Sequence, residues 1–318
     1  MRILVYFDFA ADQIDQLVRL ARRHGDHEVV VAENASCAED LASTAEVLLG
    51  HFPKSVVVAA PGLRWIQSHS AGMDGFLHPA VVERDEVVVT NMAGLYAPQG
   101  GEHAWALLLA LTRGLLPSIR SMAERQWRGG RTFELAGGTL GLIGLGGFGL
   151  ETAKRASGYE MTLLALDPVR LHPPEGVEEV RPPTQQNLLW LLSESDAVVV
   201  CCPLTDETRH MIGPGELAAM KPSAYLVCVS RGGIIDEGAL AEALRSERLA
   251  GAGLDVCEVE PLPPESSLWG APNLILTPHC AGASQHRARK TFEFFRDNLG
   301  RYLRGEPLVN VIDKGKGY

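Results

Sequence analysis

Residues 139–149 read TLGLIGLGGFG, a short apolar run that passes into a glycine-rich turn. Gly144, Gly146 and Gly149 satisfy the GxGxxG spacing, and a helical pattern over residues 150–157 follows. In such a turn one glycine allows the bend, one lets the backbone approach a pyrophosphate, and one lets helix and strand pack closely. The N–H groups and the positive dipole end of the helix then face the phosphates. The stretch predicts a strand, a dinucleotide-binding turn and a helix.

A second observation is needed, because glycine-rich turns also occur for packing reasons alone. The apolar run over residues 161–166 ends in Asp167. An acid about 20 residues beyond the turn accepts hydrogen bonds from the adenosine ribose, and its charge repels a 2′-phosphate. We therefore predict NAD(H) as the cofactor. The alternative for Asp167 is the opening of an Asp-Pro turn, and Arg170 close by leaves NADP(H) open.

Composition indicates an ordinary globular chain. Its residues are 46% hydrophobic and 21% charged, as in soluble globular proteins. A chain of 318 residues is long enough for two domains. The formal net charge of −10 and the lack of a Lys/Arg run argue against a nucleic-acid partner. No apolar run reaches about 18 residues, and the N-terminus MRILVYFDFA lacks the basic and apolar regions of a signal peptide, so no membrane partner is expected.

Cysteine usage favours reduced thiols and a cytoplasmic location. The cysteines lie mostly in apolar, strand-like runs rather than at framework spacings. No His/Cys cluster has metal-ligand spacing, so no metal site is predicted from the sequence. The six cysteines are Cys37, Cys201, Cys202, Cys228, Cys257 and Cys280.

The first 96 residues alternate strand-like and helical runs, which predicts a parallel sheet covered by helices. Residues 12–23 form an amphipathic helical pattern. A loop of small residues, 70–75, follows a strand and suits backbone contacts to a carboxylate, although a tight turn with Asp74 as a cap explains it equally well. The predicted strands are 3–7, 28–32, 56–60, 65–69 and 87–90.

Residues 97–138 connect two predicted domains. An apolar helix follows Pro98, and a polar, glycine-containing arm over residues 117–138 comes next. Trp127 in this arm is either an interface residue or buried against its own domain.

The β-α alternation continues to residue 279, as in a doubly wound sheet, whose ligands bind at the carboxyl ends of the strands. Three polar residues follow such strand ends: Arg231, Glu260 and His279. Each residue alone also has a structural explanation: Arg231 as an arginine at the rim of the sheet, Glu260 as a solvated glutamate, and His279 as a histidine that caps a turn. The predicted strands are 196–202, 224–230, 251–256 and 274–277, and helices are predicted over 187–192 and 237–245.

These segments together resemble the D-isomer-specific 2-hydroxyacid dehydrogenase family over roughly residues 65–290. The resemblance is carried by TLGLIGLGGFG with Asp167, by DAVVVCCPLTDETRHMIGPGELAAMKPSAYLVCVSRGGIIDEGALAEAL, by GAGLDVCEVEPLP and by LTPHCAGAS. It implies two Rossmann-like, doubly wound parallel-sheet domains with the active site in the cleft between them. It further implies a substrate domain of residues 1–96 completed by 286–318, an NAD-binding domain of residues 97–285, and a homodimer formed through the arm.

The resemblance also assigns roles residue by residue. Arg231 is similar to the family's substrate-binding arginine, Glu260 to the partner of its histidine, and His279 to its acid/base. Ala71 and Gly72 are similar to the backbone pair that receives the substrate carboxylate, and Asp255 to the acid that holds the nicotinamide carboxamide. The residues expected to bind cofactor are Gly144, Gly146, Phe148, Gly149, Asp167, Cys202, Val229 and Asp255.

The chemistry suits these roles independently. Reduction of a 2-keto acid needs a hydride at C2 and a proton for the developing alkoxide, so a group that titrates near neutral pH must lie beside the carbonyl. Histidine is such a group, and a neighbouring carboxylate favours its imidazolium. The forked guanidinium of Arg231 suits both the substrate carboxylate and the carbonyl oxygen.

Three residues depart from the family pattern. Cys228 replaces an asparagine, which we expect to be a structural exchange within the strand unless it moves the backbone at the nicotinamide. Cys280 follows His279, and a cationic imidazole beside it would lower its pKa and make it sensitive to oxidation. Phe148 stands in place of a smaller aliphatic residue and should leave phosphate binding intact, because the contact is made by backbone N–H groups.

The sequence thus predicts an NAD(H)-dependent reductase of a small 2-keto acid, with glyoxylate or hydroxypyruvate as the substrate. Formate oxidation is disfavoured, since relatives with that activity carry glutamine in place of Glu260. A chain of this length also disfavours phosphoglycerate dehydrogenases with regulatory domains. The alternative is a non-catalytic NAD(H) sensor, similar to the corepressors that share the fold.

Overall fold

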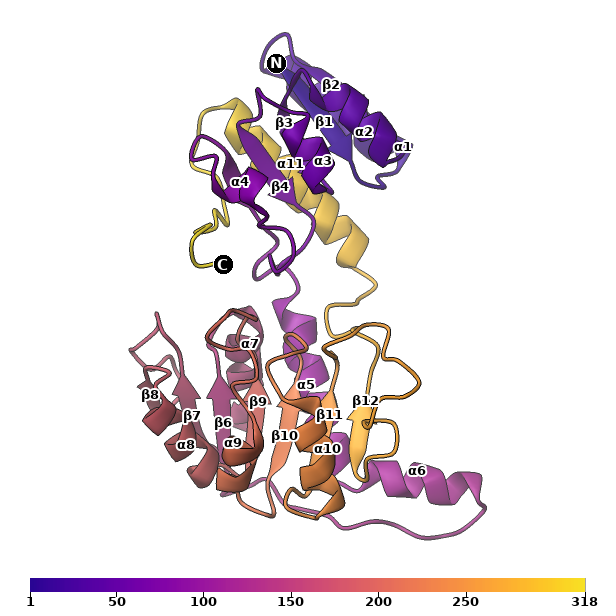
Figure 1. The fold of residues 1–318 in the computed structure, drawn as a ribbon, viewed down its shortest axis with the longest axis vertical. Coiled ribbons are helices and arrows are strands. Elements are labelled where there is room, and N and C mark those ends of the chain that lie inside the picture. The colour runs from indigo at the N-terminus through magenta and orange to yellow at the C-terminus, as the bar shows by residue number, and fades with distance from the viewer. Residues whose placement is uncertain (318) are drawn as a thin grey trace. The chain divides into compact units, whose positions relative to one another are not determined.

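The computed structural model describes residues 1–317, which form two compact units (Figure 1). Unit 1 consists of Met1–Leu95 and the chain from Ser284 onward, and unit 2 is Tyr96–Ala283. The predicted boundaries, after residues 96 and 285, lie within two residues of this division. Unit 1 is therefore built from both ends of the chain.

Unit 1 contains a five-stranded parallel sheet in the order β2-β1-β3-β4-β5. The register of its centre is set by apolar pairs, with Ile3, Leu4 and Val5 opposite Val47, Leu48 and Leu49. Strand order reverses between β1 and β3, which makes their carboxyl ends the expected ligand-binding edge. The strands are β1 (Arg2–Tyr6), β2 (Glu28–Val31), β3 (Ala45–Gly50), β4 (Trp65–Ser68) and β5 (Val88–Thr90).

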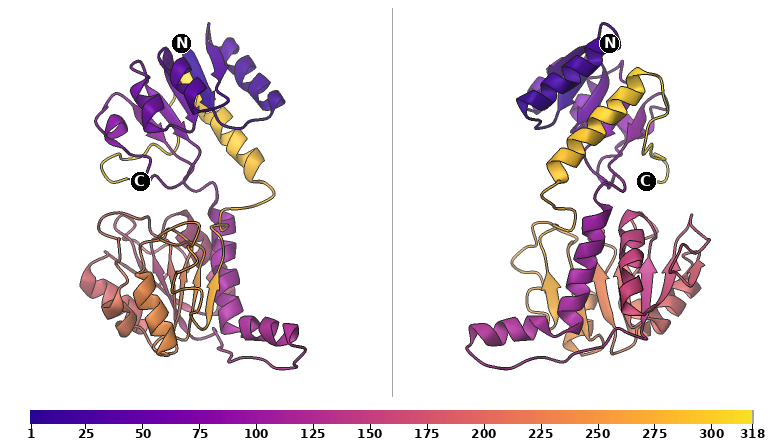
Figure 2. Two further views of the ribbon diagram at one scale, coloured as in Figure 1. Left: turned by 45° about the vertical axis from the view of Figure 1, so that its right-hand side comes forward. Right: turned by 180° about the vertical axis from the view of Figure 1, so that it is seen from behind.

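Helices cover the sheet of unit 1. One core cluster joins Leu4, Leu48 and Ile66 of the strands to Ala38 and Val56 of the helices. Helix α11 belongs to this unit and contacts α1. In Figure 2 it is the long yellow helix among the indigo and purple elements of unit 1. The helices are α1 (Ala11–Arg23), α2 (Ala35–Ala42), α3 (Lys54–Val58), α4 (Pro79–Val82) and α11 (Arg287–Leu303).

One predicted strand of unit 1 is wrong. The valine-rich run over residues 56–60 has the β-branched composition that favours a strand, yet its valines lie in helix α3, which follows Pro53. The central strand is instead β3, which the sequence analysis did not find. Residues 45–50 pair with both β1 and β4, so the pairing across the sheet overrides the local preference of β-branched residues.

Unit 2 contains a seven-stranded parallel sheet in the order β12-β11-β10-β9-β6-β7-β8. Its strand order reverses between β6 and β9, so the glycine turn after β6 lies at the switch point. The strands are β6 (Thr139–Ile143), β7 (Thr162–Leu166), β8 (Glu179–Arg181), β9 (Ala197–Val200), β10 (Tyr225–Cys228), β11 (Gly251–Leu254) and β12 (Leu274–Leu276).

Both faces of this sheet are covered, because its strands are apolar on both faces and alternate residues enter different cores. Val198 and Val200 of β9 join the cluster under α8, α9 and α10, whereas Ala197 and Val199 join the cluster under α5 and α7. The helices are α5 (Ala97–Thr112), α6 (Leu115–Ala123), α7 (Gly147–Ala156), α8 (Gln185–Glu194), α9 (Pro214–Ala219) and α10 (Glu237–Arg245), with a 3₁₀ turn, η1, at Ser157–Tyr159. The predicted doubly wound α/β fold is confirmed.

Local signals fix several helix starts. The Asp236 carboxylate accepts a hydrogen bond from the N–H of Ala239 and caps α10, and the Thr184 hydroxyl does the same for α8. Pro98 lies in the first turn of α5, where its missing N–H costs nothing. Within residues 1–317, none of the helices is long and apolar enough to cross a membrane.

The predicted arm begins with a helix. Helix α6 covers the first part of the segment, and an irregular stretch returns to β6. Trp127 is fully exposed on this stretch, so burial within its own unit is excluded for it. Leu115, Ile119 and Met122 of α6 are exposed as well.

Candidate active site

The turn after β6 has the backbone that a phosphate-binding loop requires. Gly144 has φ +97°, and a Cβ there would lie 2.7 Å from the amide N of Cys202. A Cβ on Gly149 would collide with the carbonyl of Gly144. A Cβ on Gly146 would meet no protein atom, so this position faces open space at the start of α7. The two crowded glycines build the turn, and the third leaves its backbone approachable.

Asp167 follows β7 and is only 8% exposed. Its Oδ2 accepts a hydrogen bond from Leu145 N at 2.8 Å, and its Oδ1 accepts from Val169 N and Arg170 N at 2.9 and 2.7 Å. The carboxylate therefore opens the turn after β7 and also ties it to the glycine turn. Its contact with a ribose stays a prediction.

Three further residues predicted to bind cofactor lie in the glycine turn or just beyond strand ends. Cys202 and Val229 follow β9 and β10 and are buried. Phe148 turns its ring towards α5, where a Cβ on Gly100 would lie 2.6 Å from the ring Cγ. The larger side chain is thus accommodated by helix packing.

At the carboxyl edge of the unit 2 sheet, the structure brings Glu260 and His279 together. His279 Nδ1 lies 2.7 Å from Glu260 Oε2, and Glu260 Oε1 accepts from the N–H of Cys257 at 2.9 Å. Both side chains keep a substantial exposed surface, 46% for His279 and 37% for Glu260. The imidazole is therefore oriented by a carboxylate and remains accessible.

Arg231 follows β10, the strand beside β11. Its Nη1 donates to the carbonyl of Ser230 at 2.8 Å, and the residue is half-buried. Cys228 ends β10 in register with Val200 and Leu254 on either side. The cysteine is therefore a structural exchange within an undisturbed strand, as expected.

Asp255 holds the loop that carries His279. It is 1% exposed and follows β11. Its Oδ1 accepts from Thr277 Oγ1 at 2.6 Å and Cys280 N at 2.9 Å, and its Oδ2 accepts from Ala281 N at 2.7 Å. The backbone N–H of His279 donates to the carbonyl of Asp255 at 2.8 Å, and His279 has φ +50°. The loop conformation that presents His279 thus depends on Asp255.

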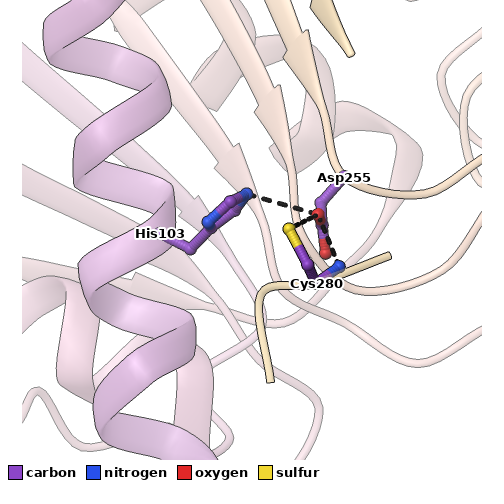
Figure 3. Close-up of side chains that lie close together, drawn as sticks. All are labelled: His103, Asp255 and Cys280. Carbon is purple, nitrogen blue, oxygen red and sulfur yellow. Dashed lines mark hydrogen bonds and ion pairs between the residues drawn. The ribbon is translucent and has the colours of Figure 1, made fainter. Parts of the chain in front are cut away.

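His103 of α5 completes this network and was missed by the sequence analysis (Figure 3). Its Nε2 lies 3.2 Å from Asp255 Oδ1 and 2.9 Å from Thr277 Oγ1. Burial alone would raise the pKa of Asp255, but hydrogen bonds from His103, Thr277, Ala281 and Cys280 outweigh it and lower the pKa to about 2. The only sequence signal for His103 was a lone imidazole in an otherwise apolar helix.

The prediction for Cys280 is wrong. Burial and the neighbouring charge of Asp255 raise the pKa of its thiol, whereas a lowered pKa was expected from His279. The Sγ atom lies 3.5 Å from Asp255 Oδ1, so its immediate neighbour is an anion. The raised pKa removes the basis for the expected sensitivity to oxidation.

In unit 1, Ala71 and Gly72 follow β4. The carbonyl of Ala71 accepts from Asn91 Nδ2 at 2.8 Å, and a turn from Met73 to Phe76 comes next. Both residues are half-buried, and their loop is fixed by a neighbouring strand end.

Two histidines at the same edge of the unit 1 sheet were also missed. His51 follows β3 and His69 follows β4, and their ring centroids lie 4.1 Å apart. Burial, and then the charge of His51, lower the pKa of His69 to about 4. Burial lowers the pKa of His51 as well.

The chain is similar to several known proteins. A glyoxylate reductase of Korarchaeum cryptofilum is 35% identical over 285 residues, 87% of this chain and 84% of the relative. A family protein from Aeromonas salmonicida superposes with a TM-score of 0.83 at 31% identity, covering 98% of this chain and 99% of that one. The NADPH-dependent glyoxylate/hydroxypyruvate reductase of Sinorhizobium meliloti superposes with a TM-score of 0.82 at 27% identity, covering 100% and 99%.

The family model for the NAD-binding domain of D-isomer specific 2-hydroxyacid dehydrogenases matches residues 105–281, which lie within unit 2. The glycine turn, Asp167 and the strand-end residues all fall in this range. The chain therefore belongs to the D-isomer specific 2-hydroxyacid dehydrogenase family.

Proposed function

We propose that this chain reduces a small 2-keto acid with NADH, with His279 as the acid/base. Its family establishes the reaction class, an NAD(P)-dependent 2-hydroxyacid dehydrogenase. The observation that carries the residue assignment is the 2.7 Å contact between His279 Nδ1 and Glu260 Oε2 at the carboxyl edge of the sheet. An accessible imidazole oriented by a carboxylate suits a proton donor.

In the proposed mechanism, the glycine turn of residues 144–149 and Asp167 would hold the cofactor, which when bound would supply the hydride for C2 of the substrate. His279 donates a hydrogen bond from Nδ1 to Glu260 Oε2. The proton on Nε2 is therefore the one transferred to the alkoxide. Glu260 stabilises the imidazolium and holds the ring. Arg231 binds the substrate carboxylate and polarises the carbonyl through its forked donors. The backbone of Ala71 and Gly72 receives the carboxylate.

Glyoxylate or hydroxypyruvate is the proposed substrate. The support is that several similar proteins are named glyoxylate reductases, and one is named a glycerate dehydrogenase. The expected preference for NAD(H) rests on Asp167. Similar solved structures include one in complex with NADP and one in complex with NADPH, so NADP(H) stays open for this chain. The cytoplasmic location stays a prediction from the cysteine pattern.

The test is NADH oxidation against glyoxylate, hydroxypyruvate, pyruvate, phenylpyruvate and 2-ketoisocaproate, with NADPH in parallel. Turnover should be fastest on glyoxylate and hydroxypyruvate, with NADH as the cofactor. His279→Ala should lower kcat by ~10² to 10⁴ while NADH still binds, because general acid catalysis contributes that much. Activity within about tenfold of the parent would contradict the role of His279.

A matched control is available in the same unit. His210 Nε2 lies 3.2 Å from Glu258 Oε2 in a second exposed His–Glu pair. His210→Ala should leave kcat unchanged, because no catalytic role is assigned to that pair. Equal losses in both variants would indicate a general effect of charge or folding.

The alternative function is a non-catalytic NAD(H) sensor of the corepressor type. NADH binding without turnover on any keto acid, together with NADH-dependent capture of a partner, would favour it. We also propose a homodimer formed through α6 and the stretch that bears Trp127, whose exposed apolar residues support this interface.

A further inference from the structure

The strongest cluster outside the proposed acid/base pair is formed by His103, Asp255 and Cys280 (Figure 3). They come from α5, the end of β11 and the loop after β12, and one potential ligand atom from each lies within 4.8 Å of the other two. Imidazole nitrogen, carboxylate oxygen and thiol sulfur are the three ligand types that Zn²⁺ takes in proteins. Among residues 1–317, this is the group that meets the distance requirement for a metal ion.

The separations fit a tetrahedral ion. Zn–N and Zn–O bonds of about 2.0 Å at tetrahedral angles separate N from O by about 3.3 Å, and a Zn–S bond of about 2.3 Å separates S from O by about 3.5 Å. The observed separations are 3.2 Å from His103 Nε2 to Asp255 Oδ1 and 3.5 Å from Cys280 Sγ to the same oxygen. Both separations from Asp255 Oδ1 therefore match those of a tetrahedral ion, and His103 Nε2 lies within 4.8 Å of Cys280 Sγ.

The hydrogen bonds at Asp255 Oδ1 indicate which contacts an ion would replace. Thr277 Oγ1 and Cys280 N donate to this oxygen at 2.6 and 2.9 Å. His103 Nε2 and Cys280 Sγ approach the same oxygen at the longer distances of 3.2 and 3.5 Å, and these are the contacts that an ion would replace. A cation would exchange two weak donors for a direct bond to each of the three side chains.

We propose that His103, Asp255 and Cys280 bind one zinc-class divalent cation, through Nε2, Oδ1 and Sγ, with water in the fourth position. On binding, the Sγ proton leaves to solvent, and the ring proton of His103 moves to Nδ1 so that the Nε2 lone pair is free. No electron is transferred. The thiolate and imidazole ligands exclude Mg²⁺ and Ca²⁺, which require oxygen ligands.

The site is accessible and adjoins the loop that carries His279. His103 keeps 20% of its side-chain surface exposed, and Cys280 is half-buried, while Asp255 is enclosed. A bound ion joins α5 to the loop after β12. Asp255 is also the residue expected to hold the nicotinamide carboxamide, so an ion bound to it competes with the cofactor and inhibits the proposed reaction. The metal-binding claim is independent of that reaction.

The test is a titration of the reduced, metal-free full-length chain with Co²⁺, without substrate or NADH. We expect one Co²⁺ per chain and a near-ultraviolet thiolate-to-cobalt absorption band that Zn²⁺ abolishes and Mg²⁺ leaves intact. Zn²⁺ should also raise the melting temperature and release a proton, since the bound thiol ionises. Absence of the band would overturn the proposal.

Two variants and one control assign the ligands. Cys280→Ser should remove the band. His103→Gln keeps a donor towards Thr277 but should weaken Zn²⁺ binding at least about tenfold. That is the smallest loss usually seen when a residue that only supports a metal ligand is replaced. Cys257→Ser is the control, because this half-buried thiol faces Glu237 and Glu260 and no imidazole of the cluster. A band that persists in Cys280→Ser, or disappears in Cys257→Ser, would place the ion elsewhere and contradict the assignment. Melting temperatures without metal show that each variant is folded.

A separate assay connects the site to turnover. Zn²⁺ should inhibit keto acid reduction by the parent and not by Cys280→Ser. If the protein does not reduce keto acids, only this inhibition assay becomes uninformative. The cobalt titration still tests metal binding, because it needs no turnover.

Discussion

Gly100 of α5 faces the ring of Phe148 at the start of α7. A Cβ on Gly100 would lie 2.6 Å from the ring Cγ and closer still to two other ring atoms, far inside normal contact distance. Phe148 is the bulky side chain within the glycine turn. The absence of a side chain at Gly100 therefore makes room for the larger residue and keeps α5 packed against α7.

Gly100→Ala should destabilise the protein by about 1–2 kcal/mol. Overpacking costs about 1–3 kcal/mol, and alanine returns up to about 1 kcal/mol through its helix propensity. Urea unfolding measures the difference. The control is Gly100→Ala in a Phe148→Leu background, where the smaller side chain should remove most of the penalty. An equal penalty in both backgrounds would show that Phe148 is not the cause.

Asp255→Asn should destabilise the protein by about 1–3 kcal/mol, because an amide NH₂ cannot accept the hydrogen bonds that the carboxylate now accepts. Turnover should fall as well, since the loop that presents His279 loosens. Urea unfolding and steady-state kinetics measure the two effects. Asp206→Asn, at an exposed site of the same unit, should change neither. A fully stable Asp255→Asn protein would refute the role assigned to Asp255.

Glu260→Gln should lower kcat/KM by about 10 to 100-fold, less than His279→Ala does, because the amide keeps the shape but not the charge that stabilises the imidazolium. Keto acid reduction by the two variants measures this difference. The control is Glu258→Gln, which alters the second exposed His–Glu pair. Unchanged kinetics in Glu260→Gln would mean that His279 works without a charged partner.

Unit 1 should lose stability in acid through His69. The pKa of His69 is about 4 in the folded chain, against 6.5 for an unperturbed histidine. Between pH 4 and pH 6.5, therefore, the His69 ring is protonated mainly in the unfolded chain. Stability from this group is complete above pH 6.5 and is lost as the pH falls from 6.5 towards 4. The groups that act on His69 are His51 and Arg287, and the Gly50 carbonyl opposes them.

His69→Asn should therefore make the stability of unit 1 less dependent on pH in this range. Amide hydrogen exchange of β3 and β4 at several pH values measures the effect. His24→Asn, at an exposed position of the same unit, is the matched control and should keep the parent's pH dependence. Identical pH profiles for the parent and His69→Asn would contradict the prediction.

Trp127→Ala combined with Met122→Asp should shift the protein from dimer to monomer in light scattering. Both side chains are exposed on the predicted arm, and an interface residue of this kind contributes by burying apolar surface. Trp269→Ala is the control, since that indole is also exposed but donates to the carbonyl of Pro263. A monomeric parent would refute the dimer.

Most of unit 2 could be predicted from the sequence because its signals are local. The glycine spacing of residues 144–149 reflects steric demands of the turn itself, and the Asp236 carboxylate caps α10 by accepting from the N–H of Ala239, three residues along the chain. Glu260 and His279 could be predicted at one edge of the sheet because the carboxyl ends of adjacent parallel strands share that edge, and Arg231 follows the next strand, β10. The contact between Glu260 and His279 follows that expectation.

Unit 1 shows where local signals fail. The valines of residues 56–58 favour a strand, but β3 occupies the centre of the sheet, and the valine run packs as a helix against it. The pairing of β3 with two neighbouring strands outweighs a propensity difference of about 1 kcal/mol or less.

The sequence by itself determined the alternation of strands and helices in unit 2, the glycine turn and the types of residue at the strand ends, since these depend on neighbours along the chain. Only the tertiary structure brought His103 to Asp255 and Cys280, residues too far apart in sequence for any spacing rule. It also reversed the expected pKa shift of Cys280, because the thiol responds to burial and to the carboxylate that folding places beside it rather than to the next residue in the chain.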